Sequence, residues 1–370
     1  MKIKLPIYFF CLLFIVAACK KKGCTDSAAG NYSPEAEKDD GSCLYLPPPD
    51  PGPTTVDRIS YGTNERQHFD LYLPGDHNAN TKTVILVHGG AWVLGPQAQD
   101  SVTTFNGGLG WDLSKKLLDE GYAVAVMKYR LACYTTQPGT YTGDPNFYMD
   151  KMLEDIDLTI DKLKSDASTL DISASDFAII GESAGAQMAL LYALRNSSDP
   201  DLKTVISFYS PADMGDEDFK TGAGSFPYNN LPLSADFGAP MYGNSCEFTT
   251  TGSVNLLWGL KSLAGYNLAN TNTNPEYTDT LSPSHLPNIQ RNLPTFVMHG
   301  ESDDLVPPSN ADTLISRITS KFGTTAAASN DFTAQHKMTK YASCGHGWSG
   351  GSCSKAQMMQ DVMSWLAEHL

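Results

Sequence analysis

Apolar residues follow two different patterns along the chain from residue 55 onward. The segments VDRISYG (56–62) and QHFDLYLP (67–74) alternate apolar and polar positions, which predicts half-buried strands. Later runs are strand-compatible without this alternation, as in TVILV at 83–87, and predict strands that are covered on both faces. Such buried strands are predicted at 83–87, 122–130, 176–183, 203–213 and 294–302, followed by a last strand at 334–342.

Segments with a helical period separate these strands. Helices are predicted at 110–121, 147–165, 183–194, 309–322 and 355–370. In the second of them, Met152, Ile156 and Ile160 recur every four residues and form one apolar stripe. The acids of this helix are assigned to its solvated face: Glu154, Asp155, Asp157 and Asp161.

Strands that alternate with helices predict an α/β fold, with a doubly wound, mostly parallel sheet and helices on both faces. Residues 214–280 are rich in Asn, Gly, Tyr and Pro and are interpreted as an irregular insertion. No internal repeat stands out, so we expect one catalytic domain over residues 55–370. Its site should lie at the carboxyl ends of the strands.

The first residues have the pattern of an export signal. Lys2 and Lys4 precede the apolar run LPIYFFCLLFIVAA, which is shorter than the roughly 20 residues of a membrane-spanning helix. The sequence VAAC at 16–19 resembles the bacterial lipobox, and this resemblance implies a signal peptide at 1–18 and a lipid on Cys19. We therefore expect an exported protein, anchored to a bacterial membrane (the outer one by preference) and facing the periplasm or the cell exterior.

Residues 19–54 are predicted to be a tether. Residues 23–45 resemble a short cysteine-containing module of exported bacterial proteins, and the resemblance implies that Cys24 pairs with Cys43. Asp39 and Asp40 favour a solvated turn over a calcium site. The stretch LPPPDPGPT at 46–54 is a proline-rich spacer, which is expected to be extended and semi-rigid.

Cysteine usage agrees with export. Besides Cys11 in the signal and the lipidated Cys19, six cysteines remain and suggest up to three disulfides: Cys24, Cys43, Cys133, Cys246, Cys344 and Cys353. Cys344 and Cys353 bracket a histidine closely and are expected to pair, which leaves Cys133 with Cys246. Free buried thiols are the alternative, and the connectivity stays open. No metal is expected, since no Cys-x-x-Cys or His-x-x-x-His spacing occurs.

The formal net charge is −15. Binding to phosphate groups needs clustered Lys and Arg, so this charge argues against nucleic acid or an anionic membrane surface as the main partner.

The stretch GESAG around Ser183 carries the first candidate chemistry. A predicted buried strand precedes it and a predicted helix follows, which is the context of a nucleophile elbow. The turn at the serine is tight, so the residues two positions away, Gly181 and Gly185, must be small. The hydroxyl then projects above the sheet at a helix N-terminus.

A serine nucleophile needs a base, and the base needs an orienting acid. The histidines after Ser183 are His285, His299, His336, His346 and His369. Of these, His346 lies on a glycine-flanked loop after the last strand, where an imidazole can reach the serine. Asp303 and Asp304 both follow a predicted strand. Here HGESDDLVP resembles the α/β-hydrolase pattern His-Gly-x-x-Asp-x-x-Val-Pro, and the resemblance selects Asp303 as the acid.

The stretch HGGAW at 88–92 resembles the His-Gly-Gly-Gly loop of esterases and lipases. The resemblance implies that backbone N–H groups of Gly90 and Ala91, with that of Ala184, bind the oxyanion. His88 is then a structural residue of the loop. Trp92, Glu182 and Trp348 are candidate substrate-binding residues, and for Trp92 core packing is equally compatible.

Together these motifs resemble the carboxylesterase and hormone-sensitive-lipase-like group of α/β-hydrolases. The resemblance implies ester hydrolysis through Ser183, His346 and Asp303, with an acyl-enzyme intermediate and no cofactor. A small-molecule ester or an ester group on a polysaccharide is the expected substrate. Alternatives are an aryl-formamidase or a peptidase of the same fold, or an inactive surface binding module; the substrate and the oligomeric state stay open.

Overall fold

A computed structural model describes residues 21–25, 33–42, 52–90, 92, 110–130, 146–195, 199–216, 279–327 and 331–370. The chain divides into two compact units, Met1–Pro51 and Gly52–Leu370. The expected export signal, Cys19, Cys43, Cys133 and Cys246 lie outside the described residues.

The first unit contains one short parallel strand pair among its described residues. Strand β1 (Lys22–Gly23) pairs with β2 (Lys38–Asp39). Cys24, which directly follows β1, is buried and disulfide-bonded.

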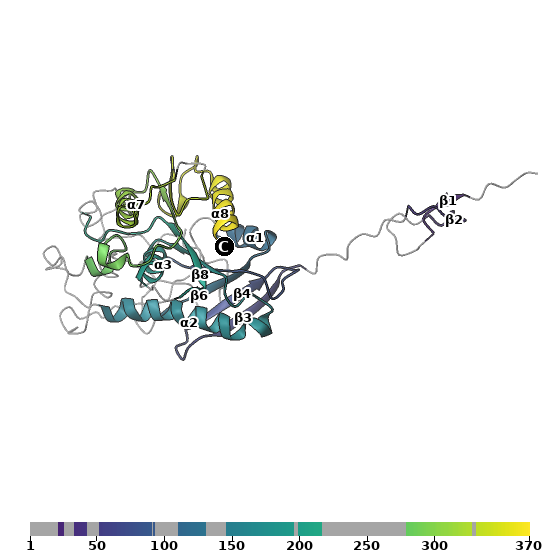
Figure 1. The fold of residues 1–370 in the computed structure, drawn as a ribbon, viewed down its shortest axis with the longest axis horizontal. Coiled ribbons are helices and arrows are strands. Elements are labelled where there is room, and N and C mark those ends of the chain that lie inside the picture. Colours follow the sequence, from purple (N-terminus) through teal and green to yellow (C-terminus); the bar gives the residue numbers. More distant parts are fainter. Residues whose placement is uncertain are drawn as a thin grey trace, which may run out of the picture. The chain divides into compact units, whose positions relative to one another are not determined.

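The second unit is built on a sheet that has eight strands within the described part of the chain (Figure 1). These strands are β3 (Thr54–Ser60), β4 (His68–Leu73), β5 (Thr83–Val87), β6 (Ala123–Lys128), β7 (Phe177–Glu182), β8 (Leu202–Phe208), β9 (Thr295–Gly300) and β10 (His336–Tyr341). Their order across the sheet is β10-β9-β8-β7-β5-β6-β4-β3. Strand β4 runs antiparallel to both β3 and β6, and the remaining pairs are parallel.

Helices cover both faces of this sheet (Figure 1). They are α1 (Gly110–Asp119), α2 (Asn146–Leu170), α3 (Ala184–Arg195), α7 (Ser309–Phe322) and α8 (Lys355–His369), with short 3₁₀ turns η4 (Leu286–Asn288) and η5 (His346–Trp348). Helices α2, α3 and α7 pack on one face, and α1 and α8 pack on the other. This strand order with helices on both faces is that of the α/β-hydrolase fold, so the predicted fold class is confirmed.

The side chains of β5 divide the core into two layers. Ile85 and Val87 join the apolar cluster under α2 and α3, whereas Val84 and Leu86 join the one under α1 and α8. All four are fully buried. Burying a side chain of this size contributes about 1.5–3 kcal/mol to folding, so the uninterrupted apolar run at 83–87 corresponds to a central strand.

Strand β4 differs from the half-buried strand that its alternation predicted, because all six of its residues are buried. Asp70, one of its polar positions, has partners inside the protein. The Asp70 carboxylate accepts a hydrogen bond from the Arg58 N–H at 2.8 Å and lies 3.4 Å from the Lys128 ammonium. A buried charge is tolerated only with such partners, so Asp70 can occupy a buried position of this strand.

The expectation that the acids of α2 lie on a solvated face is wrong for Asp155. This carboxylate is fully buried, and it accepts hydrogen bonds from the Arg130 guanidinium at 2.6 Å and from the Gln67 amide at 2.8 Å. Arg130 follows β6 and Gln67 precedes β4. Asp155 therefore ties α2 to two strand ends.

In the part of the chain that the structure describes, no helix is both long and apolar enough to cross a membrane.

Candidate active site

Ser183 lies in the sharp turn between β7 and α3. Its backbone has a φ of 50°, a conformation that costs a non-glycine residue on the order of 1–3 kcal/mol. A Cβ on Gly185 would overlap the Val87 carbonyl oxygen, and one on Gly181 would lie 2.5 Å from the Gly185 carbonyl oxygen. Only glycine fits at these two positions, which explains the spacing of the GESAG sequence.

The turn also begins helix α3. The Ser183 carbonyl accepts the Gln187 N–H at 3.1 Å, and the Ser183 N–H donates to the Phe208 carbonyl at 3.0 Å. Ala184, the first residue of α3, has an N–H at the helix start, where intrahelical acceptors are lacking. The serine hydroxyl therefore lies at the positive end of a helix dipole.

The structure brings His346 and Asp303 to this serine. The Nε2 atom of His346 lies 3.1 Å from Ser183 Oγ, and its Nδ1 atom lies 2.9 Å from Asp303 Oδ2. Ser183 and His346 are partly exposed, whereas the carboxylate is buried. An imidazole held between a hydroxyl and a carboxylate can accept the hydroxyl proton while the carboxylate fixes its tautomer.

The Asp303 carboxylate is fully engaged. Its Oδ1 atom accepts the N–H groups of Leu305 at 3.0 Å and Val306 at 2.8 Å. Burial alone would raise its pKa, but the charge interaction with His346 and the hydrogen bonds from His299 and His346 outweigh burial. The pKa of Asp303 therefore lies well below its ordinary value, and the group stays ionised.

His299, the other histidine of this motif, supports the carboxylate. Its Nε2 atom lies 2.9 Å from the Val306 carbonyl oxygen and 3.3 Å from Asp303 Oδ2. Both neighbours are acceptors, so Nε2 carries the proton. The side chain is fully buried, which separates it from the accessible serine.

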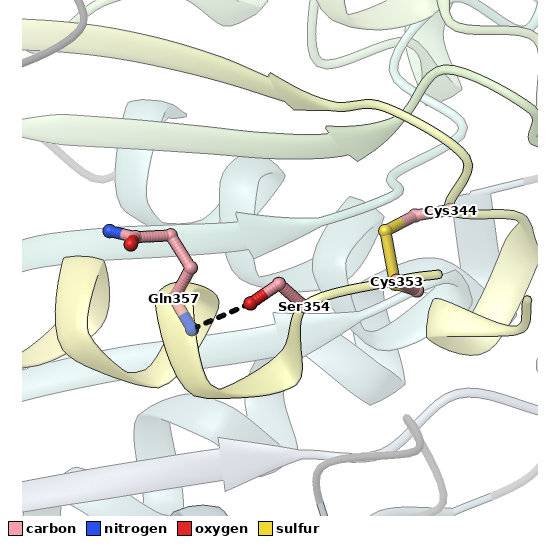
Figure 2. Close-up of a disulfide and its surroundings, with 4 residues drawn as sticks. All are labelled: Cys344, Cys353, Ser354 and Gln357. Carbon is pink, nitrogen blue, oxygen red and sulfur yellow. Dashed lines mark hydrogen bonds between the residues drawn. A yellow bond between two sulfur atoms is a disulfide. The ribbon is translucent and has the colours of Figure 1, made fainter. Parts of the chain in front are cut away.

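A disulfide closes the loop that carries His346. Figure 2 shows the bond between Cys344, after β10, and Cys353, next to the residue that caps α8. That residue, Ser354, accepts the Gln357 N–H through its hydroxyl. The Cys344 carbonyl also accepts the Ser302 N–H at 2.9 Å. The histidine loop is thus joined both to the start of α8 and to the loop that carries Asp303.

Aromatic rings pack against His346 from behind. The Tyr209 ring contacts the imidazole edge-on at 4.6 Å between centroids, and Trp348 packs on Tyr209 at 5.0 Å. Trp348 is only 1% exposed and belongs to the core under α1 and α8. Trp348 was expected to contact substrate. It instead lies in the core and supports the histidine loop.

The HGG loop approaches Ser183 from the other side. A Cβ on Gly89 would lie 3.2 Å from Ser183 Cβ, so the two backbones are nearly in contact. Gly90 has a φ of 108°, which favours glycine. Ala91, the second expected oxyanion donor of this loop, lies outside the described residues. Trp92 is buried, and its indole N–H donates to Gln187 Oε1 at 3.0 Å, so Trp92 packs in the core.

The side chain of Glu182, the residue directly before the serine, points into the protein. Its Oε1 atom accepts the Gly89 N–H at 3.1 Å, and its Oε2 atom accepts the Tyr209 hydroxyl at 2.9 Å. The side chain is buried. Glu182, expected to bind substrate, instead links the HGG loop to the tyrosine behind His346.

Sequence reasoning missed several residues that hold these loops in place: Arg66, Tyr129 and Tyr209. They lie just before β4, just after β6 and just after β8, respectively, and no local motif marks them. The only available signal was their position at strand ends. No group of three or more His, Cys, Asp or Glu side chains within the described residues is arranged to hold a metal ion.

Comparisons with known proteins identify a family and several esterase relatives. A model of the BD-FAE family matches residues 69–318, more than half of the chain. The probable isoprenylcysteine alpha-carbonyl methylesterase ICMEL1 of Oryza sativa subsp. japonica is 28% identical over 150 residues, which is 40% of this chain and 30% of the relative. The Arabidopsis thaliana isoprenylcysteine alpha-carbonyl methylesterase is 27% identical over 145 residues, 39% of this chain and 29% of the relative. The match thus spans less than a third of either relative.

Solved structures share the fold. A truncated carbohydrate esterase from gut microbiota superposes with a TM-score of 0.56 at 17% identity, covering 87% of this chain and 98% of the other. Esterase B from Lactobacillus rhamnosis gives a TM-score of 0.53 at 16% identity, covering 86% and 88%.

Proposed function

The chain belongs to the BD-FAE family of α/β-hydrolase-type esterases, and from this premise we propose that it hydrolyses carboxylic esters through Ser183, His346 and Asp303. One observation carries the proposal: a single imidazole lies within hydrogen-bond distance of both the serine hydroxyl and the buried carboxylate. Esterase names among its relatives and structural neighbours support the same class of reaction.

In the proposed reaction, Ser183 Oγ attacks the ester carbonyl carbon and His346 Nε2 takes its proton. The tetrahedral intermediate collapses, His346 returns the proton to the leaving alcohol, and an acyl-enzyme remains. Water then attacks the acyl group by the same route, with its proton passing through His346 to Ser183 Oγ. The ionised Asp303 stabilises the imidazolium at both stages.

The negative charge on the carbonyl oxygen needs N–H donors. We assign this role to Gly90 and Ala184, with Ala91 as the third donor. The Gly89 N–H is already bonded to Glu182, and no hydrogen bond of the Gly90 N–H occurs among the described residues. Each such donor contributes on the order of 10²–10³ in rate when it is preorganised.

We further propose ester-linked acyl groups on carbohydrate, such as acetyl or feruloyl groups, as the substrate class. The support is that a carbohydrate esterase from gut microbiota and an acetyl ester-xyloside bifunctional hydrolase share the fold. A panel of p-nitrophenyl esters, acetylated and feruloylated sugars and an aryl formamide ranks the candidates directly. If the protein hydrolyses the aryl formamide faster than the esters, amide hydrolysis replaces ester hydrolysis as the assigned reaction.

The decisive variant is Ser183→Ala. It removes the nucleophile, so kcat should fall by several orders of magnitude, on the order of 10⁶, with an unchanged fold. Wild type should also be labelled by a fluorophosphonate probe, and the variant should not.

A matched control is Ser207→Ala, which removes a buried serine hydroxyl that has no hydrogen-bond partner among the described residues. This variant should keep near-native activity and labelling. Near-native ester hydrolysis by Ser183→Ala, or labelling that persists in it, would exclude Ser183 as the nucleophile.

A further inference from the structure

Three buried side chains lie behind the HGG loop: Arg66, His88 and Tyr129. Arg66 precedes β4 and Tyr129 follows β6, so the polar ends of two strands meet the loop that follows a third, β5. The Arg66 Nε–H donates to the Tyr129 carbonyl at 2.8 Å, which joins two of them directly.

Tyr129 holds two carbonyl groups of the loop. Its ring stacks on His88 with 4.2 Å between centroids and an interplanar angle of 16°. Its hydroxyl lies 3.0 Å from the His88 carbonyl oxygen and 3.2 Å from the Gly89 carbonyl oxygen. Burial raises the pKa of Tyr129 far above its usual value, so the hydroxyl keeps its proton and donates it between these two acceptors.

His88 adds a second donor to the same carbonyl. Its Nδ1 atom lies 2.6 Å from the Gly89 carbonyl oxygen, which only accepts, so Nδ1 carries the proton. Its Nε2 atom lies 3.5 Å from an Arg66 guanidinium nitrogen, which only donates. Burial, with a smaller effect from Arg66, lowers the pKa of His88 to about 3. Both neighbours therefore require the same neutral tautomer.

These contacts determine the direction of one peptide unit. In a trans peptide the carbonyl and the following N–H point in opposite directions, and no cis peptide bond occurs in the described chain. With the Gly89 carbonyl held toward Tyr129 and His88, the Gly90 N–H points away from them. We propose that Tyr129 and Arg66 are positioning residues of the oxyanion site, which direct the Gly90 N–H toward the substrate oxygen through the Gly89 peptide.

This proposal rests on the proposed esterase function, and it adds residues that no motif marks. The loop has a reason to need such support. Gly90 has a φ of 108°, and glycine at this position leaves the peptide free to rotate unless its neighbours fix it. A donor that rotates loses the preorganisation on which oxyanion stabilisation depends.

The test compares two tyrosine hydroxyls. Tyr129→Phe removes the donor to the loop and keeps the stacked ring. Tyr61→Phe is the matched control, because the buried Tyr61 hydroxyl donates to the Lys128 carbonyl at 2.6 Å, one residue before Tyr129 and outside the loop. Steady-state kcat and KM are measured with p-nitrophenyl acetate, and thermal unfolding is followed for both variants.

We expect Tyr129→Phe to lower kcat by about 10- to 100-fold with little change in KM. A trifluoromethyl ketone, which forms a tetrahedral adduct with the serine, should bind more weakly by a similar factor. Tyr61→Phe should leave both quantities within about twofold of wild type, although its unfolding temperature falls comparably. Arg66→Met is the second variant, and its kcat should fall about tenfold with unchanged KM.

Equal kcat values for Tyr129→Phe and Tyr61→Phe would overturn the positioning role while leaving the esterase function intact. If Tyr129→Phe fails to fold, unchanged kcat in Arg66→Met overturns it instead. A wild-type protein without activity on esters would remove the proposed function and this inference together.

Discussion

Two loops meet at Ser183, and they are held in different ways. The HGG loop at 88–90 is held by buried polar groups: Tyr129 and the His88 ring donate to its carbonyl groups, and Glu182 accepts the Gly89 N–H. The histidine loop at 344–353 is held by a disulfide and by packing against aromatic rings.

The difference follows from what each loop presents. An N–H donor must point in a fixed direction, and hydrogen bonds are directional constraints. An imidazole must keep both nitrogen atoms available for the serine and the carboxylate. A cross-link and an edge-on ring contact restrict its position without competing for those nitrogens. The chemistry of each loop thus matches the kind of restraint around it.

Removal of the Asp303 charge, which orients His346 in the proposed reaction, should have the largest effect. Asp303→Asn keeps the size of the side chain, but its amide would donate to His346 Nδ1 and place the proton on Nε2, facing Ser183. We expect kcat to fall by about 10³–10⁴. Asp304→Asn, one residue along, is the control and should stay near wild type. Loss of less than tenfold in Asp303→Asn would remove the carboxylate from the mechanism.

Loss of the disulfide should weaken the restraint on the histidine loop and leave the HGG loop as it is. The Cys344→Ala/Cys353→Ala double variant opens a loop with a sequence separation of 9, and the free energy of unfolding should fall by about 2–3 kcal/mol. We expect kcat to fall severalfold as His346 becomes less constrained, as measured by urea unfolding and steady-state kinetics.

A reductant provides the matched comparison for that variant. Dithiothreitol should lower kcat of the wild type to the level of the double variant and leave the double variant unchanged. Equal activity of oxidised wild type and double variant would show that aromatic packing alone holds His346.

Acid should instead weaken the restraint on the HGG loop. The unfolded chain protonates His88 below about pH 6.5, whereas burial keeps its folded pKa at about 3. Protons therefore favour the unfolded state between these values, and the stability that neutral His88 provides is lost as the pH falls through this window. From pH 7 to pH 5 this site alone should cost about 2 kcal/mol.

His336, whose pKa burial lowers to about 4, adds to the acid effect with the same sign. The His88 share is isolated by comparing urea unfolding of wild type and His88→Asn at both pH values. The variant should lose less stability than wild type on acidification, and an identical loss would contradict the assignment of neutral His88.

The smallest change is expected at Tyr209, whose contacts lead to both loops. Tyr209 donates to Glu182 and packs on His346. Tyr209→Phe removes the hydrogen bond and keeps the ring. The free energy of unfolding should therefore fall by about 1 kcal/mol, and kcat should fall less than tenfold. A loss of activity as large as that of Asp303→Asn would mean that the hydroxyl takes part in the reaction itself.

Short-range sterics made much of the fold and the site predictable from the sequence. Continuous apolar runs marked the central strands, and the need for glycine at 181 follows from contacts within the turn at Ser183. The residues that hold the loops were not predictable in this way. Tyr129 and the HGG loop are some 40 residues apart, and their contact exists only after β5 and β6 have paired.

Adjacency in sequence does not decide which side chains face the site. Glu182 and Trp348 lie next to or near Ser183 and His346 in the chain, yet both side chains are buried. In a tight turn, successive side chains point to different sides. Asp155 illustrates the same limit, since an acid on a helix faces water or a buried arginine depending on which strand end lies opposite.

The crowded surroundings of Asp303 have a consequence for the path of the proton. Two backbone N–H groups and two imidazoles already occupy the oxygens of this carboxylate, and its acidity is raised accordingly. In the proposed reaction the hydrogen released by Ser183 has no resting place beyond the His346 ring. It must travel back to whichever oxygen departs, so expulsion of the alcohol and recovery of the free base become one event.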